Sequence, residues 1–333
     1  MNTRRLIAVT MFVIFFCITI VTGCGAVDTG ENVPNKVVIG TQNLADPEAI
    51  VKAEKWLETK LGCEVELVQF DSGRDVNLAM ASGEIDFGIL GSVPAALAVA
   101  NGVDCSVIYV QSVLGEIESL VVNPKSGIKS ASDLKGKTIC TPFSSTSHYS
   151  LLKYLEVNNI DPKDVDVIDM KASETVAAYV RGDIDGAFIW DPQATEIKNM
   201  GGEVLTSAEE MASLGYATMD VEIVANKFAK KYPNIVRTYI TCMDDAIKMY
   251  REDSKLAGDT MSKQLGIPTE DCISQVESSS WITSDEQKGE EWFGGKTLSN
   301  NLYQTAVFLF EQGDLLNEPK VDVFEKAVDG QYL

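Results

Sequence analysis

The sequence predicts an α/β protein of two similar lobes, in which each lobe is a mostly parallel sheet flanked by helices. Short apolar runs alternate with stretches of helical spacing, which is typical of strands joined by crossover helices. The segments Ala81–Gly91 and Val180–Trp190 also resemble each other. Each predicts a helix end, a Gly-acid-Ile-Asp turn and a buried strand. Two related halves explain this repeat, and from Asn226 onward the pattern is mainly helical.

The predicted first lobe opens with an apolar run at residues 36–42. Short apolar runs bounded by glycines and polar residues predict its other strands. These strands are expected at 64–70, 83–91, 106–111 and 118–122. The predicted helices are 47–60, 71–82 and one that begins at 92–94. This order of strands and helices favours parallel pairing.

The predicted second lobe repeats the alternation. Its strands are expected at 137–140, 165–170 and 186–190, and its helices at 147–157 and 172–181. A strand with a helix start follows at 201–210, and one more strand at 218–224. The two groups of elements therefore have the same general order.

The chain is expected to cross between the lobes twice, near Val121–Pro124 and near Met219–Val224. The first lobe is then residues 37–121 and 223–333, and the second lobe is residues 122–222. Ligands of open α/β sheets bind beyond the carboxyl ends of the strands. We therefore expect the ligand site in the cleft between the lobes.

The first residues predict an export signal rather than part of the fold. Arg4 and Arg5 precede the apolar run Leu6–Val21, which is too short for a stop-transfer helix. The next residues, Val21-Thr-Gly-Cys24, resemble a bacterial lipobox, in which Cys24 becomes the lipidated N-terminus. An ordinary signal with a chance cysteine is the alternative. The lipobox predicts a lipoprotein anchored to the outer face of the cell membrane.

Cleavage before Cys24 would remove residues 1–23 and leave residues 24–36 as a lipid-anchored tether. The cut takes away two arginines and no acidic residue, so the formal charge falls from −21 to −23. Such an acidic chain is a poor partner for nucleic acid or anionic lipid. An anionic ligand must therefore be held by local hydrogen-bond donors.

Five of the seven cysteines lie beyond the signal and the anchor. They are Cys63, Cys105, Cys140, Cys242 and Cys272. The number is odd and no C-x-x-C spacing occurs, so neither a disulfide framework nor a zinc site is indicated. A single disulfide, for example between Cys63 and Cys105, is the alternative that the sequence leaves undecided. We expect no metal and no cofactor.

The stretch Thr141–Leu152 carries the clearest chemical signal. It predicts the end of a strand, a polar turn and a helix start. Four consecutive hydroxyl residues, Ser144–Ser147, lie at that start, followed by His148, the single histidine of the chain. A helix start presents free N–H groups and the positive end of the dipole, which suits an anion. Plain N-capping, which needs one hydroxyl, is the alternative.

An enzyme is the competing class of protein. Ser147 and His148 are adjacent, so their side chains diverge, and no Gly-x-Ser-x-Gly elbow occurs. The Gly-Lys-Thr tripeptides at Gly136 and Gly295 lack the earlier glycine of a phosphate-binding loop. These residues favour a binding protein that returns its ligand unchanged.

Several motifs together resemble the solute-binding proteins of ABC importers for nitrate, sulfonates and taurine, over the chain from about Val38 to the last helices. They are Phe70–Gly73, Gly88–Ser92, Leu114–Leu120, Pro142–Tyr149, Arg181–Gly186 with Trp190, and Met219-Asp220. The Ser-Thr-x-His-Tyr run and the position of Asp220 are most similar to the taurine-binding branch. The resemblance implies a type II periplasmic-binding-protein fold.

This resemblance also implies a ligand, partners and site residues. Taurine carries a sulfonate and an ammonium, and both charges must be satisfied once the cleft excludes water. The helix starts at Ser92 and at Ser145-Thr146, with His148, are the candidates for the sulfonate. Candidates for the ammonium end are Gln42, Glu118, Trp190 and Asp220. From composition alone, Glu116 has a claim equal to that of Glu118.

We expect a monomer that delivers taurine or a related sulfonate to an ABC permease with a separate ATPase subunit. Nitrate, an aliphatic sulfonate or a thiamine-precursor pyrimidine are the alternative ligands that the resemblance leaves open. No nucleic-acid partner is expected. The membrane is reached through the lipidated Cys24.

Overall fold

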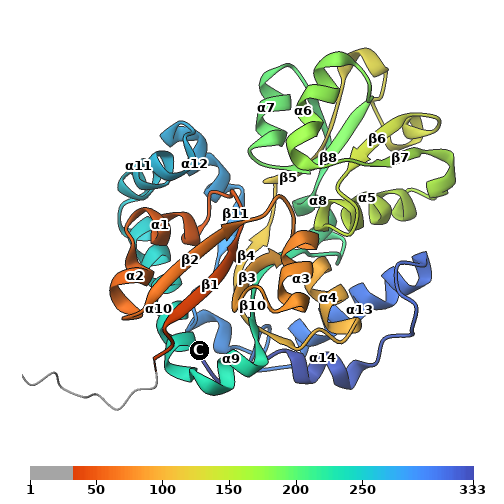
Figure 1. The fold of residues 1–333 in the computed structure, drawn as a ribbon. Coiled ribbons are helices and arrows are strands. Elements are labelled where there is room, and N and C mark those ends of the chain that lie inside the picture. The colour runs from red at the N-terminus through yellow and green to blue at the C-terminus, as the bar shows by residue number, and fades with distance from the viewer. Residues whose placement is uncertain (1–32) are drawn as a thin grey trace, which may run out of the picture. The chain divides into compact units, whose positions relative to one another are not determined.

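Two β-sheets organise residues 33–333, the part of the chain that the computed structural model describes (Figure 1). The first sheet holds β1 (Lys36–Thr41), β2 (Glu64–Gln69), β3 (Phe87–Gly91), β4 (Cys105–Leu114), β10 (Met219–Ala225) and β11 (Ser279–Trp281). The second holds β5 (Glu118–Val122), β6 (Thr138–Thr141), β7 (Asp166–Asp169), β8 (Gly186–Trp190) and β9 (Glu203–Ser207). The predicted signal peptide and the lipobox with Cys24 lie outside the described residues.

The strand order is β11-β4-β10-β3-β1-β2 in the first sheet and β7-β6-β8-β5-β9 in the second. In the first sheet β1 pairs in parallel with β2 and β3, whereas β10 runs antiparallel to β3 and β4. In the second sheet β6 pairs in parallel with β7 and β8, whereas β5 is antiparallel to β8 and β9. The two-lobed α/β class is confirmed. Each sheet is mixed, and the strand that follows a crossing between the lobes, β10 in the first sheet and β5 in the second, is antiparallel to both of its neighbours.

The crossings differ from the expected positions. Strand β5 belongs to the second sheet, so the chain leaves the first sheet at residues 115–117, before the expected Val121. The Asn123-Pro124 signal forms a short turn, Pro124–Ser126, within the second lobe. Strand β10 lies wholly in the first sheet, so a boundary at residue 222 would cut it. Proline marks a turn here, whereas the crossing is made by the short link around Gly115.

Helices cover both sheets (Figure 1). Before the first crossing lie α1 (Pro47–Ala53), α2 (Trp56–Lys60), α3 (Gly73–Ser82) and α4 (Ser92–Ala100). Those of the second lobe are α5 (Thr146–Val157), α6 (Ala172–Arg181), α7 (Gln193–Asn199) and α8 (Ala208–Ser213). The C-terminal part holds α9 (Asn226–Lys231), α10 (Pro233–Glu252), α11 (Ser254–Leu265), α12 (Thr269–Glu277), α13 (Thr297–Gln312) and α14 (Val321–Ala327).

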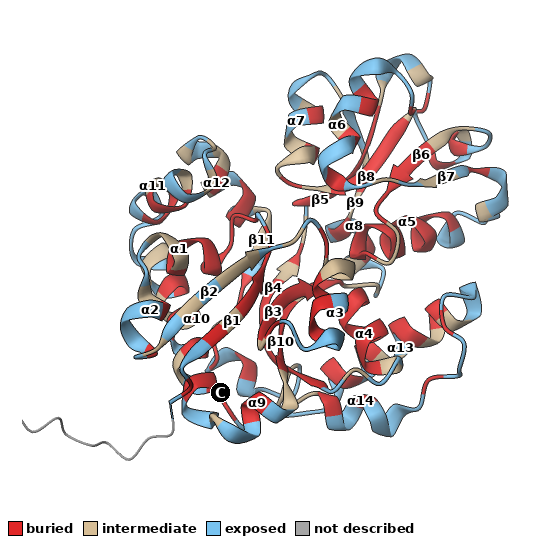
Figure 2. Ribbon diagram, in the orientation of Figure 1, coloured by how far each residue is buried: buried red, intermediate tan, exposed pale blue. Residues whose placement is uncertain are grey.

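Both faces of each sheet bury apolar side chains. Figure 2 shows buried central strands such as β3, β6 and β8, a partly exposed edge strand β2, and exposed residues on the outward sides of the helices. On one face of the first sheet, Phe87 of β3 stacks on Tyr239 of α10, with ring centroids 4.4 Å apart. On the other face, Tyr149 of α5 meets Phe308 of α13 edge-on. The alternation of apolar runs and helical spacing that predicted the fold therefore corresponds to these layers.

Two local features depart from the predicted elements. The helix expected over 47–60 is divided at Lys55, whose φ of 53° is left-handed, so α1 and α2 have different axes. Strand β11 was not predicted, because three residues are too few to show a period. It brings Trp281, which is 8% exposed, to the edge of the first sheet.

The five described cysteines are all free thiols, so the disulfide left open from the sequence does not form among them. Four are buried and Cys63 is partly buried. They behave as small apolar residues. Within residues 33–333 no helix is long and apolar enough to cross a membrane.

A network of buried polar groups joins β10 to α1 and α10. The Glu222 carboxylate is fully buried and accepts hydrogen bonds from Gln111 Nε2 at 3.2 Å and Tyr239 Oη at 2.9 Å. Nearby, Lys52 Nζ lies 3.1 Å from the buried Glu48 carboxylate. Burial, together with the Glu48 carboxylate, raises the pKa of Glu222 well above its ordinary value.

This raised pKa predicts a pH-dependent stability. A carboxyl of this kind contributes its full stability below its unfolded-state pKa and loses it as the pH rises toward the folded-state value. We expect the free energy of unfolding to fall as the pH rises above the ordinary range of a glutamate pKa, and to fall less in Glu222→Gln. Urea unfolding at several pH values measures this, with Glu84→Gln at an exposed site as control. Equal pH slopes in wild type and Glu222→Gln would contradict it.

Candidate functional site

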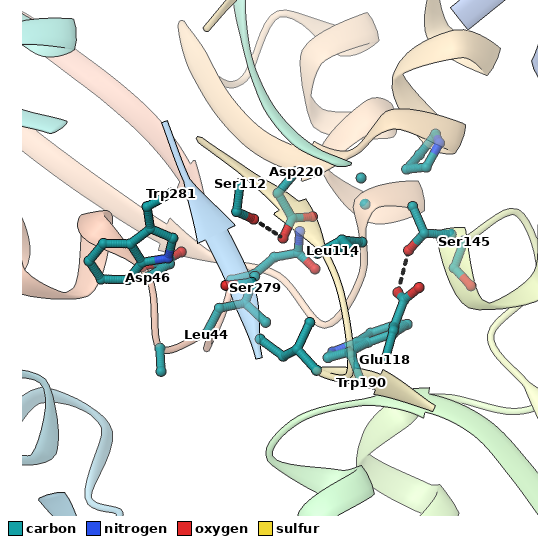
Figure 3. A pocket seen from close by; sticks show the side chains of 17 residues that line it. Leu44, Asp46, Ser112, Leu114, Glu118, Ser145, Trp190, Asp220, Ser279 and Trp281 are labelled. Atoms are coloured by element: carbon teal, nitrogen blue, oxygen red, sulfur yellow. Dashed lines mark hydrogen bonds between the residues drawn. The ribbon is translucent and has the colours of Figure 1, made fainter. Parts of the chain in front are cut away.

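A pocket of about 580 Å³, which includes space open to solvent, lies where residues of both sheets meet (Figure 3). It is lined by Gln42, Leu44, Ala45, Asp46, Gly73, Gly91, Pro94, Ser112, Leu114, Ile117, Glu118, Ser145, Thr146, Trp190, Asp220, Ser279 and Trp281. Gln42, Gly91 and Trp190 stand at the ends of β1, β3 and β8. The site is therefore at the carboxyl ends of the parallel strands, as open α/β sheets require.

The start of α5 supplies hydrogen-bond donors. Ser145 is the N-cap, and its Oγ accepts from the N–H of His148 at 3.1 Å while donating to the carbonyl of Pro142 at 2.6 Å. Within the described residues the N–H groups of Thr146 and Ser147 have no hydrogen-bond partner. One hydroxyl thus caps the helix, and the remaining N–H groups stay available for an acceptor beside Thr146.

Two further helices begin at the pocket. Gly91 precedes α4, which has no side-chain cap, and Gly73 is the first residue of α3. Gly91 also allows the two lobes to approach each other closely. A side chain at this position would clash with the other lobe, since its Cβ would lie 2.7 Å from Thr146 Cγ2. Glycine is needed at this position for the close approach. The starts of α3, α4 and α5 give the pocket a local positive field inside an acidic protein.

Three carboxylates line the same pocket. Figure 3 shows them spread along it, with Asp220 between Asp46 and Glu118 in that view. They come from three elements: the start of α1, β5 and β10. The lining residues include no lysine, arginine or histidine. The pocket therefore offers buried acceptors to a cation that the chain does not itself supply.

Burial controls the protonation of these acids. It raises the pKa of Glu118 to about 8, although the hydrogen bond from Thr146 acts in the opposite direction. Likewise, burial raises the pKa of Asp220 to about 7, opposed by a hydrogen bond from Ser112 Oγ at 3.5 Å. Thr146 Oγ1 donates to Glu118 Oε1, and Glu118 Oε2 is buried with no partner among the described residues. A cation entering the pocket would stabilise the ionised forms.

Aromatic and apolar side chains complete the wall. Trp190 is partly buried, and its position in β8 pairs with Glu118 of β5. Trp281 lines the pocket from β11. Leu44, Leu114 and Ile117 supply the apolar remainder. An indole face attracts a desolvated cation by about 1–2 kcal/mol, which supplements a carboxylate.

Six of the eight predicted ligand-binding residues line this pocket, namely Gln42, Glu118, Ser145, Thr146, Trp190 and Asp220. The structure also distinguishes two acids that the sequence left equal, because Glu118 is 2% exposed and Glu116 is on the surface. The Gln42 side chain donates to the carbonyl of Ile89 at 3.0 Å, which holds its amide at the end of β3.

The other two predicted residues, Ser92 and His148, are not among the lining residues. Ser92 Oγ accepts from the N–H of Met219 at 3.2 Å and so ties the start of α4 to β10. His148 stacks on Phe143, with ring centroids 4.4 Å apart, and its Nδ1 accepts from the N–H of Ser144 at 3.4 Å. Burial lowers the pKa of His148. Both side chains organise helix starts in this structure.

Sequence reasoning missed three pocket residues with chemical character: Asp46, Ser112 and Trp281. Asp46-Pro47 has the signature of a helix N-cap, and this role alone accounts for an aspartate at that position in the sequence. Ser112 pairs with Asp220 across the sheet, which only the register reveals. Among residues 33–333 no group of His, Cys, Asp and Glu side chains could hold a metal ion.

Comparison with known proteins identifies the family. The profile described as "NMT1/THI5 like" matches residues 58–256. The taurine-binding periplasmic protein of Escherichia coli is 34% identical over 288 residues, which are 83% of this chain and 87% of that protein. The chain belongs to the NMT1/THI5-like family. The predicted relation to solute-binding proteins of ABC importers is confirmed.

Two further proteins are similar to this chain. A putative aliphatic sulfonates-binding protein of Bacillus subtilis is 27% identical over 260 residues, covering 76% of this chain and 77% of that protein. The alkanesulfonate-binding protein SsuA of Xanthomonas axonopodis, solved with bound MOPS, superposes with a TM-score of 0.75 at 21% identity. That match covers 90% of this chain and 99% of SsuA, and it confirms the periplasmic-binding-protein fold.

The pair Glu118–Thr146 generates a prediction that needs no ligand. Because Trp190 lies opposite Glu118 in the sheet, its fluorescence should report the titration of Glu118 near pH 8. Glu118→Gln should abolish this transition. Thr146→Val removes the hydroxyl donor and keeps the shape, so it should move the transition to higher pH, because that hydrogen bond favours the charged form. A pH titration of tryptophan fluorescence measures both changes, and a transition unaffected by Glu118→Gln would refute the assignment.

Proposed function

We propose that this chain is an extracytoplasmic solute-binding protein of an ABC importer and that it binds taurine in the pocket between the lobes. The observation that supports the proposal is that the pocket has hydrogen-bond donors suited to an anion and carboxylates suited to a cation. Helix starts with free N–H groups meet buried carboxylates, and the lining holds no cationic side chain. A small zwitterion with a sulfonate and an ammonium matches both ends.

The sulfonate end is assigned to the start of α5. The N–H groups of Thr146 and Ser147 lack partners among the described residues, and Ser145 and Thr146 carry hydroxyls. A tetrahedral anion accepts several such bonds, and a helix start favours its charge. This arrangement requires no arginine or lysine, which agrees with the absence of both from the lining.

The ammonium end is assigned to Asp220 and Glu118, with Trp190 beside them. Glu118 is buried and Asp220 is partly buried, and burial raises the pKa of Asp220 to about 7 and that of Glu118 to about 8. An ammonium would stabilise their ionised forms and satisfy the unpaired Glu118 Oε2. Gln42 supports the end of β3 next to this group.

The transport role includes parts outside the pocket. We assign Cys24 as the lipid anchor and residues 24–36 as the tether, which places the receptor on the outer face of the cell membrane as a monomer. Closure of the lobes on the ligand is a hinge motion. The closed form is then delivered to the permease and its ATPase subunit, with no chemical change of the ligand.

An amine-free alkanesulfonate is the second candidate ligand. The observation that favours it is the relationship to the aliphatic sulfonates-binding proteins. The carboxylates argue against it, because an amine-free anion would leave Asp220 and Glu118 buried without a counter-charge. Nitrate and thiamine-precursor pyrimidines lack the combination of a tetrahedral anion and an ammonium that this pocket offers.

Calorimetric titration of residues 25–333 tests the ligand. Taurine should bind tightly at one equivalent, whereas ethanesulfonate and β-alanine, which each lack one of the two charged groups of taurine, should bind at least about tenfold more weakly, or about 1.4 kcal/mol. Recovery of unchanged taurine separates binding from turnover. Equal affinity for ethanesulfonate would mean that the amine is not recognised.

Asp220→Asn tests the amine anchor. Loss of one charged hydrogen-bond partner costs about 1.5–3 kcal/mol, so taurine should bind roughly 10- to 100-fold more weakly. Ethanesulfonate should bind as well as before, because it has no cation to lose. The same titrations on the variant give both values. Equal loss for the two ligands would contradict the assignment of Asp220.

A further inference from the structure

Asp46 has an incomplete set of partners. It is the N-cap of α1, where its Oδ1 accepts from the N–H of Ala49 at 2.8 Å. Its other oxygen, Oδ2, is buried and has no hydrogen-bond partner among the described residues. The side chain is 5% exposed and lines the pocket. One oxygen therefore serves the helix, and the second is buried at the ligand site without a role in the fold.

Capping does not explain a charge at this position. Asparagine, serine and threonine cap helices as well as or nearly as well as aspartate, and none of them carries the cost of a buried charge. Burial and the neighbouring Glu48 carboxylate raise the pKa of Asp46 well above its ordinary value. Asp220 acts in the same direction across the pocket.

The lysine nearest to Asp46 in this cluster, Lys52, forms an ion pair with another residue. Lys52 Nζ pairs with Glu48 at 3.1 Å and also donates to the carbonyl of Gln42 at 3.5 Å. The remaining titratable groups near this cluster are Glu222 of β10 and Tyr239 of α10, which bond to each other. No direct ion pair of Asp46 is thus present in the described part of the chain. The free oxygen needs a donor from outside the protein.

We propose that Asp46 is a ligand-binding residue that holds the cationic end of the ligand together with Asp220. The inference rests on the proposed function and extends it, because it adds Asp46, at the start of α1, to Asp220 and Glu118 as the acids on which selection for an amine depends. A primary ammonium has three N–H donors, so it can bond to both carboxylates and still face an indole. A ligand without a cation would leave two acids unpaired.

The test is Asp46→Asn, which keeps the capping oxygen and removes the charge. Taurine should bind at least about tenfold more weakly, while ethanesulfonate binds equally or better. Asp253→Asn is the matched control, since Asp253 caps α11 in the same way, through the N–H of Leu256 at 2.9 Å, at an exposed site. It should change neither affinity. Thermal unfolding checks that both variants fold, and Asp46→Ser, also a good cap, provides a second variant.

The outcomes separate this inference from the proposed function. If wild type binds β-alanine or another small amine instead of taurine, and Asp46→Asn weakens that binding, the sulfonate assignment fails and the role of Asp46 stands. Wild-type affinity for taurine in both folded Asp46 variants would overturn the inference. So would an equal loss for taurine and ethanesulfonate, because a capping role alone predicts it.

Discussion

Carboxylates buried without matching cations are the constraint on which this structure depends. Asp46, Glu118 and Asp220 line one pocket, and an isolated buried charge is costly. Burial raises the pKa of each of these acids, and single hydroxyl donors, Thr146 and Ser112, lie next to two of them. A cation in the pocket would stabilise the ionised carboxylates.

The same pocket must also accept an anion, and the topology makes this possible. Parallel strands end where helices begin, so α4 and α5 direct N–H groups to the edge at which Glu118 and Asp220 enter from antiparallel strands. The N–H donors come from helices that follow parallel strands, whereas Glu118 and Asp220 come from the antiparallel strands β5 and β10. A mixed sheet can therefore present both signs of charge within one small volume, which a purely parallel sheet does less readily.

Most of the fold could be predicted because strands and helices leave different periods in the sequence. The left-handed Lys55 and the three-residue β11 leave no period, so they could not. Among site residues, Glu118 and Asp220 were predicted through the family resemblance, since composition alone did not distinguish Glu118 from Glu116. Asp46 was concealed by its second role as a cap. His148 attracted attention as the single histidine, but a sequence cannot show that its ring stacks on Phe143.

The contact between Gly91 and Thr146 has a mechanical consequence. Main chain of one lobe meets a side chain of the other, with no room for even a methyl group. The approach of the two lobes at this point is therefore limited by the main chain at Gly91 and by the short, β-branched side chain of Thr146. A receptor built in this way has a hard stop, so the size of the enclosed ligand is limited by geometry as well as by chemistry.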